Sequence, residues 1–166
     1  AVKIVCRSNF DHDRPYAREF AGLLKFEPIS RSSESQVDIL HVGCDEPNGY
    51  FYYVMELADD QERGQDVDPI HYTPRTLRSE LLRRGRLPVA ECLEIGLYLV
   101  RALKHLHQHS LVHRDVKPSN LIYVNGIPKL ADIGLITGVG DARTLLEPKV
   151  MFREKEREHH KPTSTP

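Results

Sequence analysis

The stretch HRDVKPSN, from His113 to Asn120, is followed twelve residues later by the tripeptide DIG, which begins at Asp132. Phosphoryl transfer needs a residue that orients the attacking hydroxyl and groups that hold magnesium against the phosphates. Asp115 can accept a hydroxyl proton, and Lys117 can neutralise charge that gathers on the transferred group. Asn120 and Asp132 offer the hard oxygen ligands that magnesium prefers. The spacing therefore indicates metal-assisted phosphoryl transfer.

The segments around this stretch predict that its metal ligands converge. A long apolar helix precedes it, and two short strands, residues 121–124 and 128–131, follow on either side of Asn125-Gly126. Asn-Gly between apolar runs is a strong signal for a tight β-hairpin. Such a hairpin would return both magnesium ligands to the same end of a small sheet. A polar surface turn would explain the composition of the octapeptide, but not this order of elements.

These residues resemble the motifs of the protein kinase superfamily, whose catalytic loop reads HRDxKPxN and whose metal loop reads DFG. Lys117, two residues after Asp115, is typical of the serine/threonine branch, and Ile133 replaces the usual phenylalanine of the metal loop. We expect this apolar exchange to keep the packing role. The resemblance covers residues 2–144. It implies a eukaryotic-like, Hanks-type serine/threonine protein kinase that uses ATP and Mg2+ to phosphorylate Ser or Thr hydroxyls of a protein substrate.

The resemblance also implies a role for each polar residue of the two loops. Asp115 would orient the substrate hydroxyl, and Lys117 would steady the γ-phosphoryl group. Asn120 and Asp132 would be the magnesium ligands. His113 would pack the catalytic loop and would not be the base.

An alternating strand at residues 2–5 places Lys3 where the kinase pattern VAIK has the lysine that pairs with the α- and β-phosphates. The segment at residues 15–26 begins with a proline and carries its apolar residues on one face, which predicts a helix. By resemblance, Glu19 on this helix would pair with Lys3 and fix it against the phosphates. Taken alone, a lysine in a strand is usually solvated, and Glu19 has the alternative explanation of a solvated helix charge.

Two further strands are expected at residues 37–42 and 50–57, which are β-branched and aromatic and separated by a turn-forming stretch. By resemblance, Met55 would guard the back of the adenine pocket. The hinge from Glu56 through Leu57 to Ala58 would then bind adenine with its backbone groups. Met55 can at the same time be a simple core residue.

These elements predict an α+β protein with the two-lobe, protein kinase-like fold in incomplete form. Helices are expected at residues 76–84, ended by Gly85, and at residues 88–107, whose wide apolar arc predicts burial from several sides. Four parts are expected along the chain: a partial N-lobe with the hinge (1–58), a flexible linker (59–75), a partial C-lobe with the catalytic and metal loops (76–144), and a tail (145–166).

The tail is charged and lacks apolar periodicity, which predicts disorder. A sharper hypothesis is a frameshift after about Thr144. Moving the frame of the codons for residues 147–166 by one base permits TEGYVPREGAGTPQADLYS, which resembles a kinase activation segment. Because Ala1 already lies in the lysine strand, we also expect the chain to be a piece of a longer product, without the glycine-rich loop that covers the ATP phosphates.

Incomplete packing then bears on stability and activity. The helix at residues 88–107 normally packs against helices of the C-lobe that we do not expect in this chain. Each Leu or Val side chain left exposed forfeits about 1.5–3 kcal/mol. A few such losses equal the net stability of an ordinary domain, about 5–15 kcal/mol. We therefore expect a marginal, aggregation-prone fold with weak or absent catalysis.

The composition argues against several other classes of protein. A formal net charge of -1 gives no electrostatic case for binding nucleic acid or a membrane surface. No stretch is long and apolar enough for a membrane span, and no signal peptide is visible. Three cysteines without a CxxC pair predict neither a disulfide framework nor a zinc site, and they suit a cytoplasmic location.

Two other functions stay open. A small-molecule phosphotransferase could share the paired metal ligands, although such enzymes usually lack the combination of Arg114, Lys117 and Pro118 found here. A non-catalytic nucleotide-binding or interaction fragment is the other alternative. It is favoured by the parts of a kinase that we do not expect in this chain, and not by any lost catalytic residue.

Overall fold

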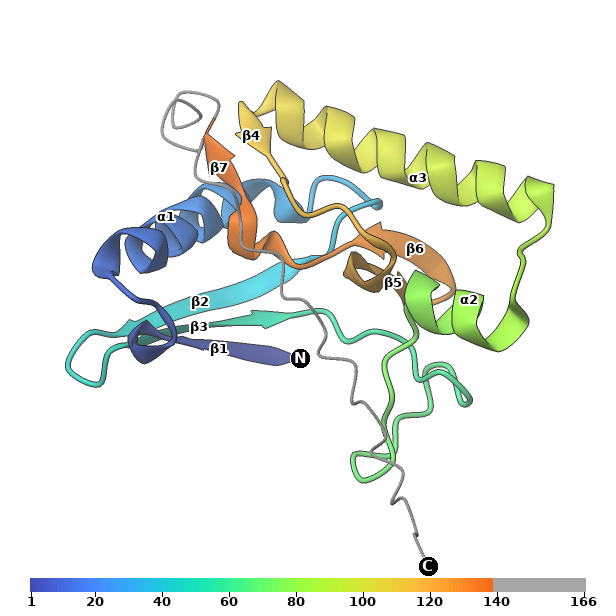
Figure 1. The fold of residues 1–166 in the computed structure, drawn as a ribbon, viewed down its shortest axis with the longest axis horizontal. Helices are drawn as coiled ribbons and strands as arrows, with labels where there is room; N and C mark the ends of the chain where they lie inside the picture. Colours follow the sequence, from blue (N-terminus) through green and yellow to red (C-terminus); the bar gives the residue numbers. More distant parts are fainter. Residues whose placement is uncertain (139–166) are drawn as a thin grey trace, which may run out of the picture.

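The structure is a computed structural model, and it describes residues 1–138 of the chain. The predicted tail at residues 145–166, together with the frameshift hypothesis, lies outside the described residues. Within residues 1–138 the architecture is α+β, as predicted. Small antiparallel sheets combine with three α-helices in this part of the chain (Figure 1).

The first half of the chain forms a three-stranded antiparallel sheet in the order β1-β3-β2. Its strands are β1 (Val2–Cys6), β2 (Ile39–Asp45) and β3 (Tyr50–Met55). A short 3-10 helix, η1 (Arg7–Asn9), and the long helix α1 (Asp13–Ser30) connect β1 to β2 (Figure 1). Strand β2 begins and ends later than the predicted 37–42, so the turn before β3 is shorter than expected.

The second half of the chain is mostly helical and carries the catalytic stretch. Its helices are α2 (Leu77–Arg84) and α3 (Val89–Gln108), with the 3-10 helices η2 (Pro118–Asn120) and η3 (Ile133–Leu135). Its strands are β4 (Leu111–Val112), β5 (Leu121–Val124), β6 (Ile127–Leu130) and β7 (Thr137–Gly138). They form two antiparallel pairs, β4 with β7 and β5 with β6. The β4–β7 pair was not predicted.

The β5–β6 hairpin confirms the prediction made from Asn125-Gly126. Both turn residues have positive φ, 52° for Asn125 and 77° for Gly126, as the tightest hairpin turns require. Val124 lies opposite Ile127, and Leu121 lies opposite Leu130. The turn therefore fixes the register of both strands, and it brings the start of β5 next to the end of β6.

Helix α1 begins two residues before the predicted start and continues to Ser30. An aromatic cluster holds it to the sheet, because the rings of Tyr16 and Phe20 lie 5.2 and 5.0 Å from that of Phe51 on β3. At its middle, Gly22 touches the segment that follows η3. A β-carbon at residue 22 would lie 2.2 Å from the Ile136 carbonyl oxygen. Glycine is therefore required there for close packing, although its φ is ordinary.

A second connection joins the sheet half to the helical half, besides the hinge. This connection is formed by the buried residues 35–37, which precede β2 in the sequence and lie alongside the end of β6. Leu130 donates its N–H to the Ser35 carbonyl and accepts from the Val37 N–H. The Gln36 amide donates to the carbonyl of Ala102 on α3 at 2.8 Å. The two halves therefore share a hydrogen-bonded junction that lies far from the hinge in sequence.

The segment at residues 59–75 is anchored, which differs from the expected flexible linker. Asp59 is buried, and its carboxylate accepts the N–H groups of Asn125 and Gly126, both at 2.8 Å. The Asp59 N–H in turn donates to the Tyr123 carbonyl at 2.7 Å. Asp60, also buried, accepts three backbone N–H groups of the same segment. These two carboxylates tie the segment to itself and to the hairpin turn.

Helix α2 matches the predicted bounds closely. Thr76 caps its start by accepting the Ser79 N–H at 3.0 Å, and Gly85, with a φ of 72°, ends it. Inside it, the fully buried Glu80 carboxylate is surrounded by the guanidinium groups of Arg75, Arg83 and Arg84. Hydrogen bonds from these arginines lower the pKa of Glu80, although burial acts in the opposite direction.

Helix α3 is buried on one side only. Ile95, Ala102 and Leu106 face the core, whereas four large apolar residues on its other side are more than half exposed. These exposed residues are Val89, Leu93, Leu97 and Val100. The prediction of burial from several sides is wrong for the described residues. The related expectation of several unpartnered Leu and Val side chains agrees with this exposure.

Replacement of Gly22 by alanine tests the close packing of α1. We expect Gly22→Ala to destabilise the protein by about 1–3 kcal/mol, because the new methyl group must push α1 away from a backbone carbonyl. The matched control is Gly96→Ala on α3, where a β-carbon meets no atom within 4 Å. That change should stabilise the protein by up to about 1 kcal/mol through helix propensity. Denaturant unfolding that gives both changes the same sign would contradict this packing.

The anchor at residue 59 gives a second prediction. Asp59→Ala leaves the N–H groups of Asn125 and Gly126 without their acceptors, so we expect a loss of about 2–4 kcal/mol in unfolding free energy. Asp66→Ala is the control, because Asp66 lies in the same segment and is exposed. It should change stability by no more than about 0.5 kcal/mol. Equal effects of the two substitutions in thermal or urea unfolding would show that the segment is not anchored through Asp59.

Candidate active site

The catalytic stretch leaves α3 through β4 and is held in place by a buried histidine. His113 is 1% exposed, and one of its ring nitrogens lies 3.0 Å from the Ala131 carbonyl oxygen. Its other ring nitrogen faces the Asp115 N–H at 3.4 Å. Burial lowers the pKa of His113, which keeps the ring neutral. The imidazole thus links the catalytic loop to the segment just before Asp132.

The polar residues of the catalytic loop form one connected group. The Lys117 ammonium lies 2.6 Å from an oxygen of the Asp115 carboxylate. The side-chain amide of Asn120 donates to the Asp115 carbonyl at 2.8 Å and to the same carboxylate oxygen at 3.1 Å. Asn120 is 5% exposed, and the η2 turn that begins at Pro118 sets its direction. A cation and an amide donor therefore hold the Asp115 carboxylate in a fixed orientation.

The metal loop lies directly beside the catalytic loop, because the Ala131 N–H donates to the Asn120 carbonyl at 2.8 Å. This bond continues the β5–β6 ladder by one pair. The next residue, Asp132, has left-handed backbone geometry, with φ of 58° and ψ of 72°. A non-glycine residue in that region is uncommon and costs energy, so the surrounding contacts must hold it. The strain gives the Asp132 carboxylate its direction towards β1.

The expected Lys3–Glu19 pair is not formed in the structure. The Lys3 ammonium instead pairs with an oxygen of Asp132 at 2.6 Å. Burial alone would lower the pKa of Lys3, but Tyr53 and Asp132 more than offset this effect, so the pKa is raised. Lys3 pairs with Asp132 because the left-handed backbone geometry of Asp132 brings its carboxylate to Lys3. Glu19 is therefore near the cation but is not its partner.

Glu19 lies against the glycine of the metal loop. A β-carbon at Gly134 would lie 2.7 Å from a carboxylate oxygen of Glu19 and 3.5 Å from one of Asp132. Burial raises the pKa of Glu19, the Lys3 cation opposes the rise, and the Asp132 carboxylate adds to it. The three charged groups therefore share one site between α1, β1 and the metal loop. Gly134 leaves room for both carboxylates.

The hinge follows β3 in extended conformation. Met55 exchanges backbone hydrogen bonds with Ala1, so the end of β3 is paired with the residue just before β1. The Glu56 side chain binds the Lys129 ammonium at 2.7 and 2.8 Å and accepts the Asp38 N–H at 2.9 Å. Within residues 1–138, no hydrogen bond engages the Glu56 carbonyl.

The backbone of Leu57 and the N–H of Ala58 likewise have no partner among the described residues, whereas the Ala58 carbonyl accepts from the Tyr72 hydroxyl at 3.1 Å. A planar base with one donor and one acceptor edge finds suitable partners in such unpaired backbone groups. The side chain of Leu57 is 37% exposed, while Ala58 is buried. The hinge thus offers backbone groups, and not side-chain charge, to a ligand.

The chemistry of Asn120 and Asp132 fits magnesium. The Asn120 amide nitrogen donates to Asp115, and among the described residues its oxygen accepts only a long contact of 3.5 Å from the Ser119 hydroxyl. Lys3 engages one oxygen of Asp132. Within residues 1–138 there is no cluster of three His, Cys, Asp or Glu side chains that could enclose a metal. Magnesium usually takes one or two protein oxygens and completes its shell with water and phosphates, so two ligands are enough.

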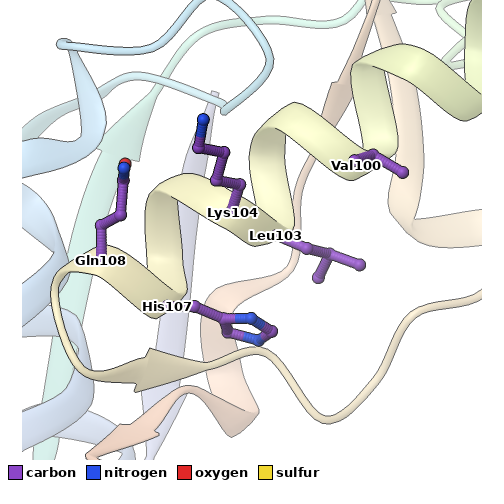
Figure 2. Close-up of a pocket in the computed structure, with 5 residues that line it drawn as sticks. All are labelled: Val100, Leu103, Lys104, His107 and Gln108. Atoms are coloured by element: carbon purple, nitrogen blue, oxygen red, sulfur yellow. The ribbon is translucent and has the colours of Figure 1, made fainter.

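A separate surface hollow lies on α3. Figure 2 shows its lining of Val100, Leu103, Lys104, His107 and Gln108, all on one helix. The hollow contains neither of the predicted magnesium ligands nor any hinge residue. In the described part of the chain, no helix is both long and apolar enough to cross a bilayer.

The loop residues singled out in the sequence lie beside one another in the structure, and one buried polar residue near them, Tyr53, was not singled out. The structure brings Asp115, Lys117 and Asn120 into one network and sets it beside the Lys3–Asp132 pair. Tyr53 lies fully buried opposite Lys3 on the sheet. Its pairing could have been found by aligning β1 with β3, since Lys3 and Tyr53 follow from that register.

The fold and this site together define a protein kinase domain. The chain belongs to the family described as Protein kinase domain, which it matches over residues 1–152. It is 29% identical over 141 residues to the serine/threonine-protein kinase PrkC of Bacillus subtilis, a match that covers 84% of the chain and 19% of PrkC.

Two further relatives point the same way. The chain is 30% identical over 138 residues to the MAP kinase kinase MKK1/SSP32 of Saccharomyces cerevisiae, covering 81% of the chain and 24% of that kinase. It is 46% identical over 59 residues to the human cell division cycle 7-related protein kinase, covering 34% of the chain and 10% of that kinase. The chain therefore spans at most about a quarter of these relatives.

The buried histidine gives a prediction about pH. The pKa of His113 is lower in the folded protein than its ordinary value of 6.5, so the unfolded chain binds the proton more readily. The stability that depends on this neutral ring is present above pH 6.5 and is lost as the pH falls below it. We expect His113→Phe to cost about 1–2 kcal/mol at pH 7.5, because the Ala131 carbonyl loses its donor.

That difference in unfolding free energy should shrink at pH 5.5. Below pH 6.5 the unfolded chain of the unchanged protein is stabilised by binding a proton at His113, and the His113→Phe variant has no such proton to bind. His107→Phe is the matched control, because His107 lies exposed on α3. It should change the unfolding free energy at pH 7.5 by no more than about 0.5 kcal/mol. If the His113→Phe stability curve runs parallel to that of the unchanged protein between pH 5.5 and 7.5, the ring is not held neutral by burial.

Proposed function

We propose that this chain carries the catalytic core of a protein serine/threonine kinase, which transfers phosphate from ATP to Ser or Thr hydroxyls with Mg2+. The observation that carries the proposal is the joined pair of loops. Asp115, Lys117 and Asn120 form one network, and a backbone bond places Asp132 beside it. Paired Lys and Asn contacts around one carboxylate suit a group that orients a hydroxyl and then receives its proton.

Each residue has a task in this reaction. Asp115 would accept the substrate hydroxyl proton. Lys117 would then move from the Asp115 carboxylate to balance charge on the transferred phosphoryl group. Lys3, on the neighbouring strand, would place the α- and β-phosphates. Asn120 and Asp132 would hold magnesium, which supplies positive charge to the phosphate oxygens.

The adenine of ATP would lie at the hinge between the sheet and the helical half. Met55 would close the back of the pocket, and the backbone of Glu56, Leu57 and Ala58 would supply the hydrogen bonds. The carbonyl of Glu56 and the N–H of Ala58, which have no backbone hydrogen-bond partner among the described residues, support this assignment. A protein substrate and a cytoplasmic location belong to the same proposal.

A second function is favoured by one observation, the Lys3–Asp132 pair. In this arrangement the Lys3 cation neutralises a proposed magnesium ligand, and Glu19 has no ion-pair partner within residues 1–138. A protein that kept this pair would bind nucleotide without transferring phosphate. The exposed face of α3 supports weak or absent catalysis for a separate reason. Its exposed apolar residues lower the stability of the helical half.

Nucleotide-dependent melting, measured with a non-hydrolysable ATP analogue, tests the proposal. We expect the analogue to raise the melting temperature, and Mg2+ to add to the rise, because a ligand at 100 times its Kd stabilises by about 2.7 kcal/mol. Asp132→Asn should remove the part that depends on Mg2+. Asp115→Asn should keep it, while phosphorylation of a Ser/Thr peptide falls by about 10²–10⁴-fold. The exposed Asp66→Asn should change neither.

The outcomes separate the three functions. Transfer to a peptide supports the kinase, whereas a melting shift without any transfer supports the non-catalytic nucleotide-binding protein. Transfer to small hydroxyl compounds but not to peptides supports a small-molecule phosphotransferase. If the analogue produces no shift with or without Mg2+, the assignment of Asn120 and Asp132 as magnesium ligands fails.

A further inference from the structure

Tyr53 stands at the centre of the charged site but belongs to none of the kinase motifs discussed above. It lies on β3 directly opposite Lys3 of β1, so both side chains project from the same face of the sheet. Tyr53 is 1% exposed, and the Lys3 ammonium lies 5.9 Å from its ring centroid. The neighbouring Tyr52 projects from the opposite face, where its ring meets that of His41.

The hydroxyl of Tyr53 is enclosed and, among the described residues, has no hydrogen-bond partner. A buried phenol without a partner is costly, and phenylalanine would fill the same volume without that cost. Three charged groups surround it nevertheless. Burial raises the pKa of Tyr53, the Lys3 ammonium opposes the rise, and the Asp132 and Glu19 carboxylates add to it. The hydroxyl is therefore within electrostatic reach of every charge in the site.

We infer that Tyr53 is a positioning residue, whose hydroxyl holds the Lys3 ammonium in the nucleotide site when Asp132 is given over to magnesium. The inference rests on the proposed function. A phenol oxygen can accept a hydrogen bond from an ammonium group and donate its own hydrogen to a carboxylate. In the structure Lys3 is bound by Asp132, and the Tyr53 hydroxyl lies close enough for Lys3 to affect its pKa but makes no hydrogen bond of ordinary length within residues 1–138.

The exchange follows from the geometry of the site. A cation bound to Asp132 repels Lys3 and weakens the 2.6 Å pair that now holds it. Lys3 then needs another acceptor at once, or its flexible side chain turns to solvent. Tyr53 is opposite on the same sheet face and is rigidly packed, and Glu19 lies beside the same metal loop. The hydroxyl, with Glu19 as its own acceptor, keeps Lys3 aimed at the phosphates.

The test compares two ligands on one protein. Lys3 acts on phosphates, so Tyr53→Phe should weaken the binding of Mg2+–ATP by about tenfold, the size expected for one hydrogen bond to a charged group. Adenosine, which has no phosphates, should bind with unchanged affinity. A merely structural role for Tyr53 would change both affinities together. Tyr52→Phe, one residue away on the other face, is the control and should change neither Kd.

Two further measurements make the test specific. In a Lys3→Met background, Tyr53→Phe should have no added effect on ATP affinity, because the hydroxyl acts through Lys3. The melting temperature of the unliganded Tyr53→Phe protein should stay equal or rise, since a buried hydroxyl without a partner is removed. Equal weakening of ATP and adenosine, or full additivity with Lys3→Met, would overturn the inference. If the unchanged protein binds adenosine but not ATP, the proposed function fails, and this inference fails with it.

Discussion

The two-residue turn at Asn125-Gly126 is the constraint on which the site depends. Both residues adopt positive φ, so β5 and β6 are joined without slack and their register has a single solution. Because the ladder is fixed, the Ala131 N–H meets the Asn120 carbonyl, and the metal loop starts where the catalytic loop ends. A slip by one residue would turn Asp132 to the other face of the hairpin and separate it from the catalytic residues.

Local chemistry explains why much of the fold could be predicted. The hairpin, the glycine at the end of α2 and the long helix α3 are each specified by residues that lie next to one another in sequence. The same holds for the network around Asp115, since Lys117 and Asn120 lie within five residues of it. Turn and cap residues act through their own backbone preferences, so no distant contact is needed to infer them.

Other features depend on contacts that a linear reading does not contain. The partner of Lys3 is decided by the strained backbone of Asp132, which comes from the far end of the described chain. Asp59 reads as one acidic residue among several, and only its meeting with the hairpin turn makes it an anchor. The apolar arc of α3 predicted burial without saying what would cover it, and tertiary packing covers only one side.

The junction between residues 35–37 and β6 has a mechanical consequence. The sheet half is joined to the helical half at two places, the hinge and this second crossing, and each is fastened by hydrogen bonds to β6 or its neighbours. Two connections held by hydrogen bonds define one axis between the two halves. We therefore expect rotation of one half relative to the other to occur mainly about the axis that passes through these two connections.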